Sequence, residues 1–349
     1  MRRAIITTFI ICMFTIISTS YATTSKTSSN ATKENTVNQQ NMQFSQRQDV
    51  QKFINLMVKK HQFKKENLEQ IFNKVHIQQS ILKTMSKPAE TWSWYKYQKF
   101  FLTTSRIQGG ITFWNNHAKT LADIEKKDGV PASVIVAIIG VETAYGQNQG
   151  SYRVLDSLST LAFEYPKRKK FFQSELEAYL LLARDNQFDV TSMLGSYAGA
   201  IGQGQFMPSS YRHYAVNYNG KGQTDLRSDT DDVIASIGNY LEKHGWARNK
   251  IIASKAQVTG SRYKKLTKNQ LKPQYSVAFL KKHGVVPIIS VPSTAKSNFM
   301  VLEGKNTPQY WLGFHNFYVI SRYNPRINYA MAVYQLSEAI KKARTLSNH

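Results

Sequence analysis

The sequence predicts a mainly α-helical protein with a minor β part, an α+β fold in which helices supply most of the core. Two observations support this fold class. Over much of the chain between residues 48 and 250, and again after residue 310, apolar residues recur at intervals of three and four, as on one face of a helix. Between residues 251 and 310 the pattern changes to short β-leaning runs divided by Gly, Pro, Ser and Asn, which indicates a small, mostly β insert.

Composition limits the classes of protein to consider. The chain has 349 residues, of which 42% are hydrophobic, so it has enough apolar residues for a core and is not disordered as a whole. Its length favours two or three domains. The 46 Lys and Arg against 22 Asp and Glu give a formal net charge of +24, which predicts attraction to a polyanion: nucleic acid, a membrane surface or an acidic polysaccharide. A single cysteine excludes an internal disulfide or a Cys-based zinc site.

Residues 1–22 are expected to be a cleaved signal peptide. They open with two arginines, continue with an apolar, uncharged stretch, and end with Ser20 and Ala22 at the positions that signal peptidase requires to be small. A retained membrane anchor is the alternative, but the apolar run is short for a span of ~20 residues. Cys12 lacks the small residues that precede a lipidated cysteine, so we expect a periplasmic protein that is not a lipoprotein. Its polyanion would then be cell-envelope material.

The segment after the signal peptide divides into a linker and a helical region. Residues 23–47 are rich in Ser, Thr, Asn and Gln and predict a disordered linker. Residues 48–127 are expected to form a helical N-terminal region that Pro88 interrupts. The first predicted helix begins at residue 49, and a second covers residues 68–75. One long helix is predicted over residues 110–126.

Turn and cap residues divide the remainder of the chain. Pro131 precedes a strongly apolar helix that is expected to stop at Gly146, and Gly245 closes another predicted helix. The helices expected here, besides the apolar one, are at residues 169–186, 229–244 and 329–344. The β-leaning runs of the insert are at residues 257–258, 275–279, 285–291 and 299–302.

Glu142 is the residue whose position points most directly to chemistry. It ends the most apolar segment that follows the signal peptide, and Ile138 and Ile139 share its face of the helix. Desolvation there would favour the neutral acid and raise its pKa, and a carboxyl group protonated near pH 7 is what cleavage of a glycosidic bond requires. The alternative is a solvent-facing residue at the end of a helix, and local physics alone favours that alternative.

Two other segments carry polar groups suited to a ligand. Residues 196–210 contain crowded glycines together with Ser196, Gln203 and Gln205, which would let a ligand approach the main chain closely. A tight helix–helix contact through small residues is the alternative, and the segment lacks the pattern of a phosphate-binding loop. Residues 321–325, Ser-Arg-Tyr-Asn-Pro, would suit a sugar or a peptide, but equally a loop cap.

Three motifs together resemble the lytic murein transglycosylase B family. They are Val141-Glu142-Thr143 with Tyr145-Gly146, then GAIGQGQFMPSS over residues 199–210, then Phe317-Tyr318 with Arg322-Tyr323-Asn324. The likeness extends from about residue 50 to residue 344. It implies a lysozyme-like α core, here residues 128–250 and 311–349, with the helical region of residues 48–127 in front and the β insert of residues 251–310 within the core.

The resemblance implies a reaction and a single catalytic acid. Glu142 would protonate the oxygen of the MurNAc–GlcNAc β-1,4 bond of peptidoglycan glycan strands, and its carboxylate would then take the proton of the C6 hydroxyl that attacks C1. The products would be 1,6-anhydro-MurNAc ends, formed without water and without a second catalytic carboxylate, unlike most glycoside hydrolases. No cofactor, metal or nucleic acid is implied, and we expect a monomer associated with the wall by charge.

The resemblance also implies which residues bind the substrate. Ser196 would hold the N-acetyl group, and Arg168 would meet stem-peptide carboxylates; Lys167 beside it is a less certain contact because lysine lacks the guanidinium fork. The other residues implied to line the sugar path or to close on the acid are Tyr97, Gln205, Phe206, Tyr240, Tyr323, Asn324 and Tyr329. Core packing remains an alternative role for Phe206.

One segment departs from the family pattern. Members can carry a calcium loop at the position of residues 217–225, but Asn217, Asn219 and Lys221 stand here where anionic oxygens are wanted. We expect weak or no calcium binding and a loop held by protein contacts.

Three other functions remain open on sequence grounds. A hydrolytic muramidase would need a second carboxylate, for which Asp156 and Glu164 are candidates by sequence distance. A non-catalytic peptidoglycan-binding protein would keep the aromatic and basic residues without a buried acid. A nucleic-acid binder is suggested by charge, but the basic residues are spread along the chain and export argues against it.

Overall fold

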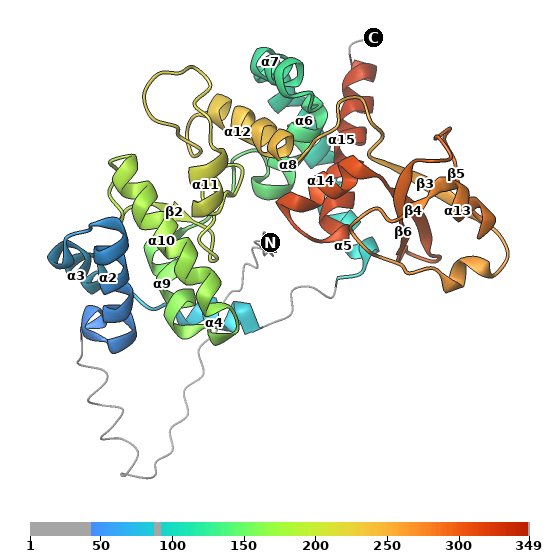
Figure 1. Cartoon of the computed structure of the whole chain (residues 1–349). Coiled ribbons are helices and arrows are strands. Elements are labelled where there is room, and N and C mark those ends of the chain that lie inside the picture. The colour runs from blue at the N-terminus through green and yellow to red at the C-terminus, as the bar shows by residue number, and fades with distance from the viewer. Residues whose placement is uncertain (1–42, 87–91, 348–349) are drawn as a thin grey trace, which may run out of the picture.

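The computed structural model describes residues 43–86 and 92–347, so the expected signal peptide and most of the expected linker lie outside the described residues. The mainly α fold class is confirmed, with a small sheet in the last third of the chain (Figure 1). A 3-10 turn at Phe44–Gln46 opens the described chain. The N-terminal helices follow: α2 (Gln48–His61), α3 (Lys65–Asn73), α4 (Gln79–Ser86), α5 (Trp94–Phe101), α6 (Thr104–Asn116) and α7 (Ala118–Asp128).

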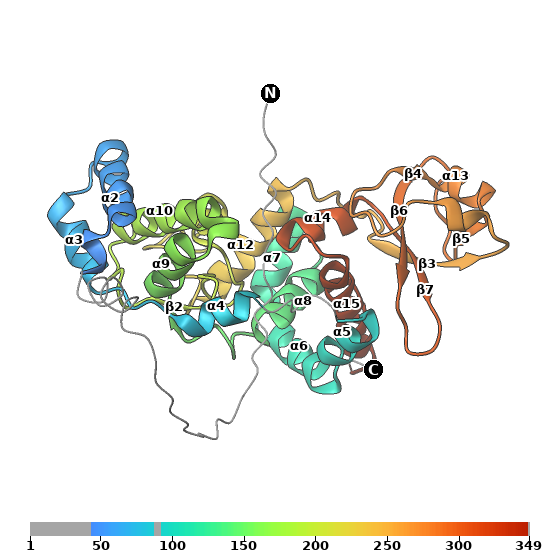
Figure 2. The same ribbon diagram turned by 90° about the horizontal axis from the view of Figure 1, so that it is seen from below.

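Helix α8 (Ala132–Thr143) is the centre of the fold. Its sequence is apolar on all sides, and each of its residues except Glu142 is buried. A helix without a polar face must be surrounded by other elements. Helices α6, α7, α12 (Thr230–Lys243) and α15 (Ile327–Ser347) all pack against it, as their clustering in Figure 2 illustrates.

Three further helices extend the core on the side away from the sheet. They are α9 (Val154–Glu164), α10 (Lys169–Asp185) and α11 (Pro208–Tyr214), with a 3-10 turn at Pro166–Arg168 between the first two. Helix α14 (His315–Tyr323) lies on the sheet side and packs against α12, α15 and β7. The pair α9 and α10 lies between α2–α3 and α8 in Figure 2. A two-stranded ladder, β1 (Tyr152–Arg153) with β2 (Leu194–Gly195), joins the start of α9 to the chain after α10.

The sheet forms a separate layer at the opposite end of the molecule from α2 and α3 (Figures 1 and 2). Its strand order is β4-β6-β7-β3-β5 and all its pairs are antiparallel. The strands are β3 (Ala253–Val258), β4 (Tyr275–Ser276), β5 (Val285–Pro287), β6 (Lys296–Leu302) and β7 (Gln309–Gly313), and helix α13 (Val277–Lys282) packs beside β4 and β5. The insert has a small apolar core of its own, formed by Leu266, Val277, Leu280, Val285, Phe299, Leu312 and Phe314.

Three of the expected elements are wrong in detail. The single helix expected over residues 110–126 is two helices, because His117 leaves helical geometry with ψ 28° between α6 and α7. The strand expected over residues 275–279 ends at Ser276, whose hydroxyl accepts a hydrogen bond from the backbone N–H of Phe279 and caps α13. The run at residues 285–291 is a strand only as far as Pro287.

Within the described part of the chain, no helix combines the length and the apolar character that a membrane span requires.

Asp156 on α9 ties the N-terminal helices to the core. Its buried carboxylate accepts hydrogen bonds from both Nε and Nη2 of Arg153 at 2.8 Å and from the backbone N–H of His76 at 2.9 Å. One turn further along α9, the Thr160 hydroxyl accepts a bond from the backbone N–H of Gln78. The link between α3 and α4 is therefore fixed to α9 by polar contacts.

Replacing the Asp156 carboxylate tests how much these polar contacts stabilise the fold. Asp156→Ala removes the buried acceptor of the Arg153 guanidinium and leaves the backbone N–H of His76 without its acceptor, so the free energy of unfolding should fall by roughly 2–3 kcal/mol. Urea denaturation followed by circular dichroism measures the change. Glu242→Ala is the matched control, because Glu242 forms an exposed pair with Lys243 and its loss should change stability by less than about 0.5 kcal/mol. Equal effects of the two substitutions would contradict this role of Asp156.

Candidate active site

The C-terminal end of α8 has an unusual backbone that turns the chain sharply after Glu142. Ala144 and Tyr145 are in the left-handed region, with φ 50° and 64°, and Gly146 follows at φ 85°. The Thr143 hydroxyl stabilises this turn, because it donates to the carbonyl of Gln203 at 2.7 Å and accepts from the N–H of Gly146 at 2.9 Å. One side chain thus joins the end of α8 to the Gly/Gln-rich loop.

Helix α6 fixes the other side of the turn. The Tyr145 hydroxyl donates to the carbonyl of Arg106 at 2.7 Å, and the Arg106 guanidinium donates to the carbonyl of Gly140. Gly140 permits this packing, since a Cβ atom there would lie only 2.6 Å from the Tyr145 hydroxyl oxygen. The position of Glu142 is therefore set from both sides of the helix.

Glu142 is the single residue of α8 that reaches solvent, and it is only half-buried. Burial raises the pKa of its carboxyl group to about 8. The Tyr329 hydroxyl on α15 donates a 2.7 Å hydrogen bond to Glu142 Oε1, which lowers the pKa by a smaller amount. The side chain is consequently a protonated acid at neutral pH and can give up that proton at a mildly basic pH.

Four of the predicted aromatic residues form one buried cluster behind the acid. The rings of Phe206, Tyr240 and Tyr323 meet edge to face with centroids 4.9–6.0 Å apart, and Tyr329 stacks on Tyr323 at 6.4 Å. All four are at most 5% exposed, so their rings pack against one another. Their hydroxyls are engaged as well: Tyr323 donates to the carbonyl of Gly204 and Tyr240 to that of Arg322. The cluster holds the Gly/Gln loop, the end of α14 and α15 together.

Tyr97 on α5 lies on the other side of the acid. Burial raises the pKa of its phenol, the Glu142 charge raises it further, and Arg326 lowers it, so the three groups are electrostatic neighbours. Among the described residues its hydroxyl oxygen is buried with no hydrogen-bond partner. A buried, unsatisfied hydroxyl beside a protonated acid is available to a ligand group.

The Gly/Gln-rich loop places Ser196 and Gln205 close to the main chain. Ser196 is 2% exposed, and its hydroxyl oxygen accepts from the N–H groups of Ala200 and Ala198 at 3.0 and 3.3 Å. Gln205 is in the left-handed region with φ 51°, and its side-chain amide donates to the carbonyls of Gly202 and Gln149. Both side chains therefore shape the loop, and the Ser196 proton can still be donated.

Two arginines, Arg168 and Arg326, are electrostatic neighbours of each other, and the sequence analysis found the first of them. The guanidinium carbon of Arg168 lies 4.0 Å from the centroid of the Phe171 ring. Burial lowers the pKa of Arg168, and the charge of Arg326 lowers it as well. Arg326 thus acts on both Arg168 and Tyr97 and belongs to the same site, although sequence analysis missed it. The available signal was its place directly after Asn324-Pro325.

Asn324 is 3% exposed and, in the part of the chain that the structure describes, its Oδ1 atom has no hydrogen-bond partner. Lys167 is exposed, in contrast to the half-buried Arg168.

The two candidates for a second catalytic carboxylate both have structural partners. Asp156 is bound by Arg153 and the backbone of residue 76, as described above. Glu164 forms an ion pair with Arg47, which also pairs with Asp49. Neither is an unpaired carboxylate.

The loop of residues 217–225 is closed by protein contacts. The buried carboxylate of Asp232 accepts from the N–H groups of Tyr218 at 2.7 Å and Asp225 at 2.9 Å. The Asn217 side chain bonds both the N–H and the carbonyl of Lys221. Over the described residues, no group of three or more His, Cys, Asp or Glu side chains is placed to hold a metal ion.

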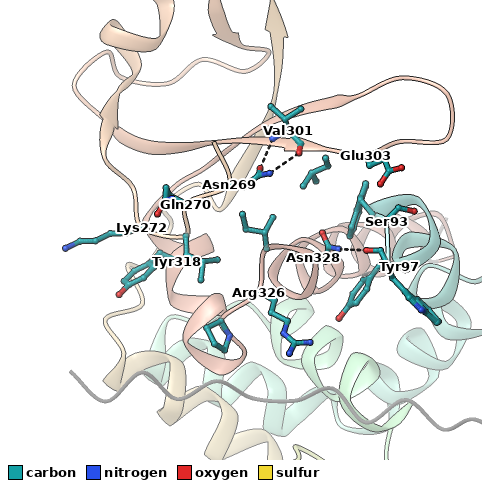
Figure 3. Close-up of a pocket in the computed structure, with 16 residues that line it drawn as sticks. Ser93, Tyr97, Asn269, Gln270, Lys272, Val301, Glu303, Tyr318, Arg326 and Asn328 are labelled. Atoms are coloured by element: carbon teal, nitrogen blue, oxygen red, sulfur yellow. Dashed lines mark hydrogen bonds between the residues drawn. The ribbon is translucent and has the colours of Figure 1, made fainter. Parts of the chain in front are cut away.

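A cavity of about 760 Å³ is lined by Tyr97, the electrostatic neighbour of Glu142, and we call it the groove cavity (Figure 3). Tyr97, Ser93 and Asn328 lie at one end and Gln270, Lys272 and Tyr318 at the other, with Arg326 below. Its walls come from three parts of the chain: the segment leading into α5, the insert, and the turn between α14 and α15. The hydrogen bond from the N–H of Tyr95 to the carbonyl of Glu303 joins the first two walls.

Comparisons with known proteins show a likeness over most of the chain. Residues 45–338 match the family model described as the transglycosylase SLT domain. The chain is 40% identical over 313 residues to membrane-bound lytic murein transglycosylase B of Escherichia coli K12, covering 86% of this chain and 85% of that protein.

Solved structures show the same likeness. The catenated lytic transglycosylase SltB1 of Pseudomonas aeruginosa is 43% identical with a TM-score of 0.83, covering 86% of this chain and 99% of that one. SltB3 of the same organism, in complex with NAG-NAM-pentapeptide, is 28% identical with a TM-score of 0.74, covering 82% of this chain and 78% of that one.

The hydrogen bond from Tyr329 makes the pKa of Glu142 testable. Tyr329→Phe removes a donor that stabilises the carboxylate, so the pKa of Glu142 should rise above its value of about 8. NMR titration of protein labelled with ¹³C at the glutamate carboxyl, with Glu142→Gln to assign the signal, measures the pKa. Tyr334→Phe, on the same helix but bonded to the carbonyl of Ala253, should leave it unchanged. A lower pKa in Tyr329→Phe would show that the bond does not favour the carboxylate.

Proposed function

The chain belongs to the transglycosylase SLT domain family and is a lytic transglycosylase of peptidoglycan, and from that premise we propose that Glu142 is its single catalytic acid and base. The neutral carboxyl protonates the oxygen of the MurNAc–GlcNAc β-1,4 bond as the bond from that oxygen to C1 breaks. The substrate's own N-acetyl oxygen meets the positive charge at C1. The Glu142 carboxylate then takes the proton of the C6 hydroxyl of the same MurNAc. The oxygen of that hydroxyl bonds C1 at the same time, which forms the 1,6-anhydro ring.

One observation carries this assignment: the carboxyl group that ends the buried helix α8 reaches solvent with a pKa near 8. A group that first gives and then takes a proton works best with a pKa near the operating pH. Both candidates for a second carboxylate have structural partners, which favours a single acid over the muramidase mechanism.

The neighbouring residues have roles that follow from their contacts. Tyr329 holds the Glu142 carboxyl in place, and the cluster of Phe206, Tyr240 and Tyr323 keeps α15 against the Gly/Gln loop. The buried polar atoms of Tyr97 and Asn324 that lack a partner among the described residues would meet the sugar. Ser196 would donate its proton to the N-acetyl group, with Gln205 shaping the loop.

Arg168 and Arg326 together form a positive site suited to the carboxylates of peptides attached to MurNAc.

We further propose that the protein acts in the periplasm, after cleavage of the signal peptide behind Ala22, as a monomer drawn to the wall by its positive charge. Peptidoglycan carries peptide carboxylates, so a basic protein is attracted to it. N-terminal sequencing of the exported protein tests the cleavage site.

Product analysis tests the reaction. Purified residues 23–349 acting on isolated peptidoglycan should release muropeptides with 1,6-anhydro ends, and Glu142→Gln should reduce the rate by at least about a hundredfold because the amide cannot donate the required proton. Mass spectrometry identifies the products. Asp156→Asn should keep the same products.

Products heavier by one water, or their loss in Asp156→Asn with the fold intact, would instead support a hydrolytic muramidase. Sedimentation with peptidoglycan and no product from either Glu142 form would support a binding protein.

The pKa of Glu142 also fixes the sign of the pH dependence. Since the protonated form starts the reaction, kcat/KM should be level below pH 8 and fall about tenfold per pH unit above it. Initial rates of anhydro-product formation between pH 5 and 10 measure the profile. A fall that begins near pH 5 would indicate an ordinary carboxyl pKa and contradict the proposal.

A further inference from the structure

A second cavity, of about 850 Å³, lies at the junction between the core and the insert, and we call it the junction cavity. Its floor is apolar, with Ile251, Val291 and Phe314 among the lining side chains. Lysines line it from three separate segments: Lys250 after α12, Lys272 in the loop before β4, and Lys296 at the start of β6. Carbon-rich walls combined with ammonium groups suit a ligand that carries both small apolar groups and negative charges.

The junction cavity adjoins the groove cavity. Lys272 and Tyr318 line both cavities, and Figure 3 shows these two residues at the end of the groove cavity opposite Tyr97. Tyr97 in turn is an electrostatic neighbour of Glu142. The groove cavity therefore has a neighbour of the acid at one end and the junction cavity at the other.

The charge at the junction cavity has no counterpart in the chain. No Asp or Glu lines it, and within the described residues the ammonium groups of Lys250, Lys272 and Lys296 make no ion pair or hydrogen bond. The surrounding sequence is also basic, because residues 251–302 contain eight lysines and one arginine but no acidic residue. An anionic ligand would thus meet uncompensated positive charge.

We propose that the junction cavity binds a peptide of the peptidoglycan strand, on a MurNAc distant from the bond being cleaved. This inference rests on the proposed function, since the glycan must lie along the groove cavity for its peptide to reach the junction. The carboxylates of the peptide pair with Lys250 and Lys296, and its small side chains pack on the apolar floor. The enzyme would then prefer strands that still carry their peptides.

An anionic lipid headgroup has related chemistry, but the position next to the groove cavity favours a ligand attached to the glycan, because the two cavities share Lys272 and Tyr318.

The test compares two substrates: glycan strands with their peptides, and the same strands after an amidase has removed the peptides. Lys250→Glu/Lys296→Glu leaves the groove cavity untouched and should raise KM on the peptide-bearing strands roughly five- to tenfold at unchanged kcat, as expected when two exposed charge contacts become repulsions. The loss should be much smaller on peptide-free strands and should shrink in 0.5 M salt. Lys281→Glu/Lys282→Glu, on α13 outside the cavity, is the control with equal charge and should show no substrate preference.

A direct binding measurement separates this inference from the proposed reaction. Calorimetry of soluble muramyl pentapeptide with the Glu142→Gln protein should show weaker binding after the Lys250→Glu/Lys296→Glu change, whatever the products of the native enzyme are. An equal rise in KM on both substrates, or a substrate preference in the control variant, would overturn the proposal. The Lys250→Glu/Lys296→Glu protein could instead lose binding to phosphatidylglycerol vesicles and keep its preference for peptide-bearing strands. That result would also overturn the proposal and would assign the cavity to lipid. Absence of anhydro products from native protein would overturn the proposed function instead.

Discussion

The burial of one carboxyl group at the end of α8 is the constraint on which the rest of the site depends. An ordinary glutamate is ionised at neutral pH, and only removal from water keeps this one neutral. That removal requires a helix buried on all sides, which in turn requires α6, α7, α12 and α15 around it. The packing of the core around α8 therefore produces the neutral acid on which the chemistry of the site depends.

This arrangement has a cost in stability whose sign is fixed. The pKa of Glu142 is near 8 in the folded protein, above the ordinary value of 4.5, so the folded state binds the proton more tightly than the unfolded chain does. The stability linked to that proton is fully present below pH 4.5 and is lost as the pH rises toward 8. Contacts remote from the acid, such as the bonds of Asp156 between α9 and the N-terminal helices, add stability without affecting that proton.

Sequence patterns predicted several of the longer helices, whether or not these are amphipathic. Helices α2 and α10 have an apolar face and α8 is apolar on all sides, and all three were predicted. Helix α9 was not predicted, although its apolar residues recur at helical spacing; its polar residues are buried as well, which sequence alone does not reveal. The apolar run before Glu142 was informative because a charged residue ended it. The hydrogen-bond partner of Glu142 could not be inferred from local sequence alone, since Tyr329 lies 187 residues away, and Arg326 acts through space on Tyr97 and Arg168. The resemblance to a family supplied Tyr329, and only the structure supplied Arg326.

The structure also shows where part of the positive charge lies, which composition alone could not show. A formal charge of +24 spread along a sequence predicts only that some polyanion is attracted. In the fold, Arg326 lines the groove cavity and acts on both Tyr97 and Arg168, while an insert segment without any acidic residue lines the adjoining junction cavity. Positive charge at two neighbouring cavities suits a polymer that repeats its anionic groups at intervals, as a glycan strand bearing peptides does. The insert then extends the binding surface beyond the lysozyme-like core, and the core alone does the chemistry.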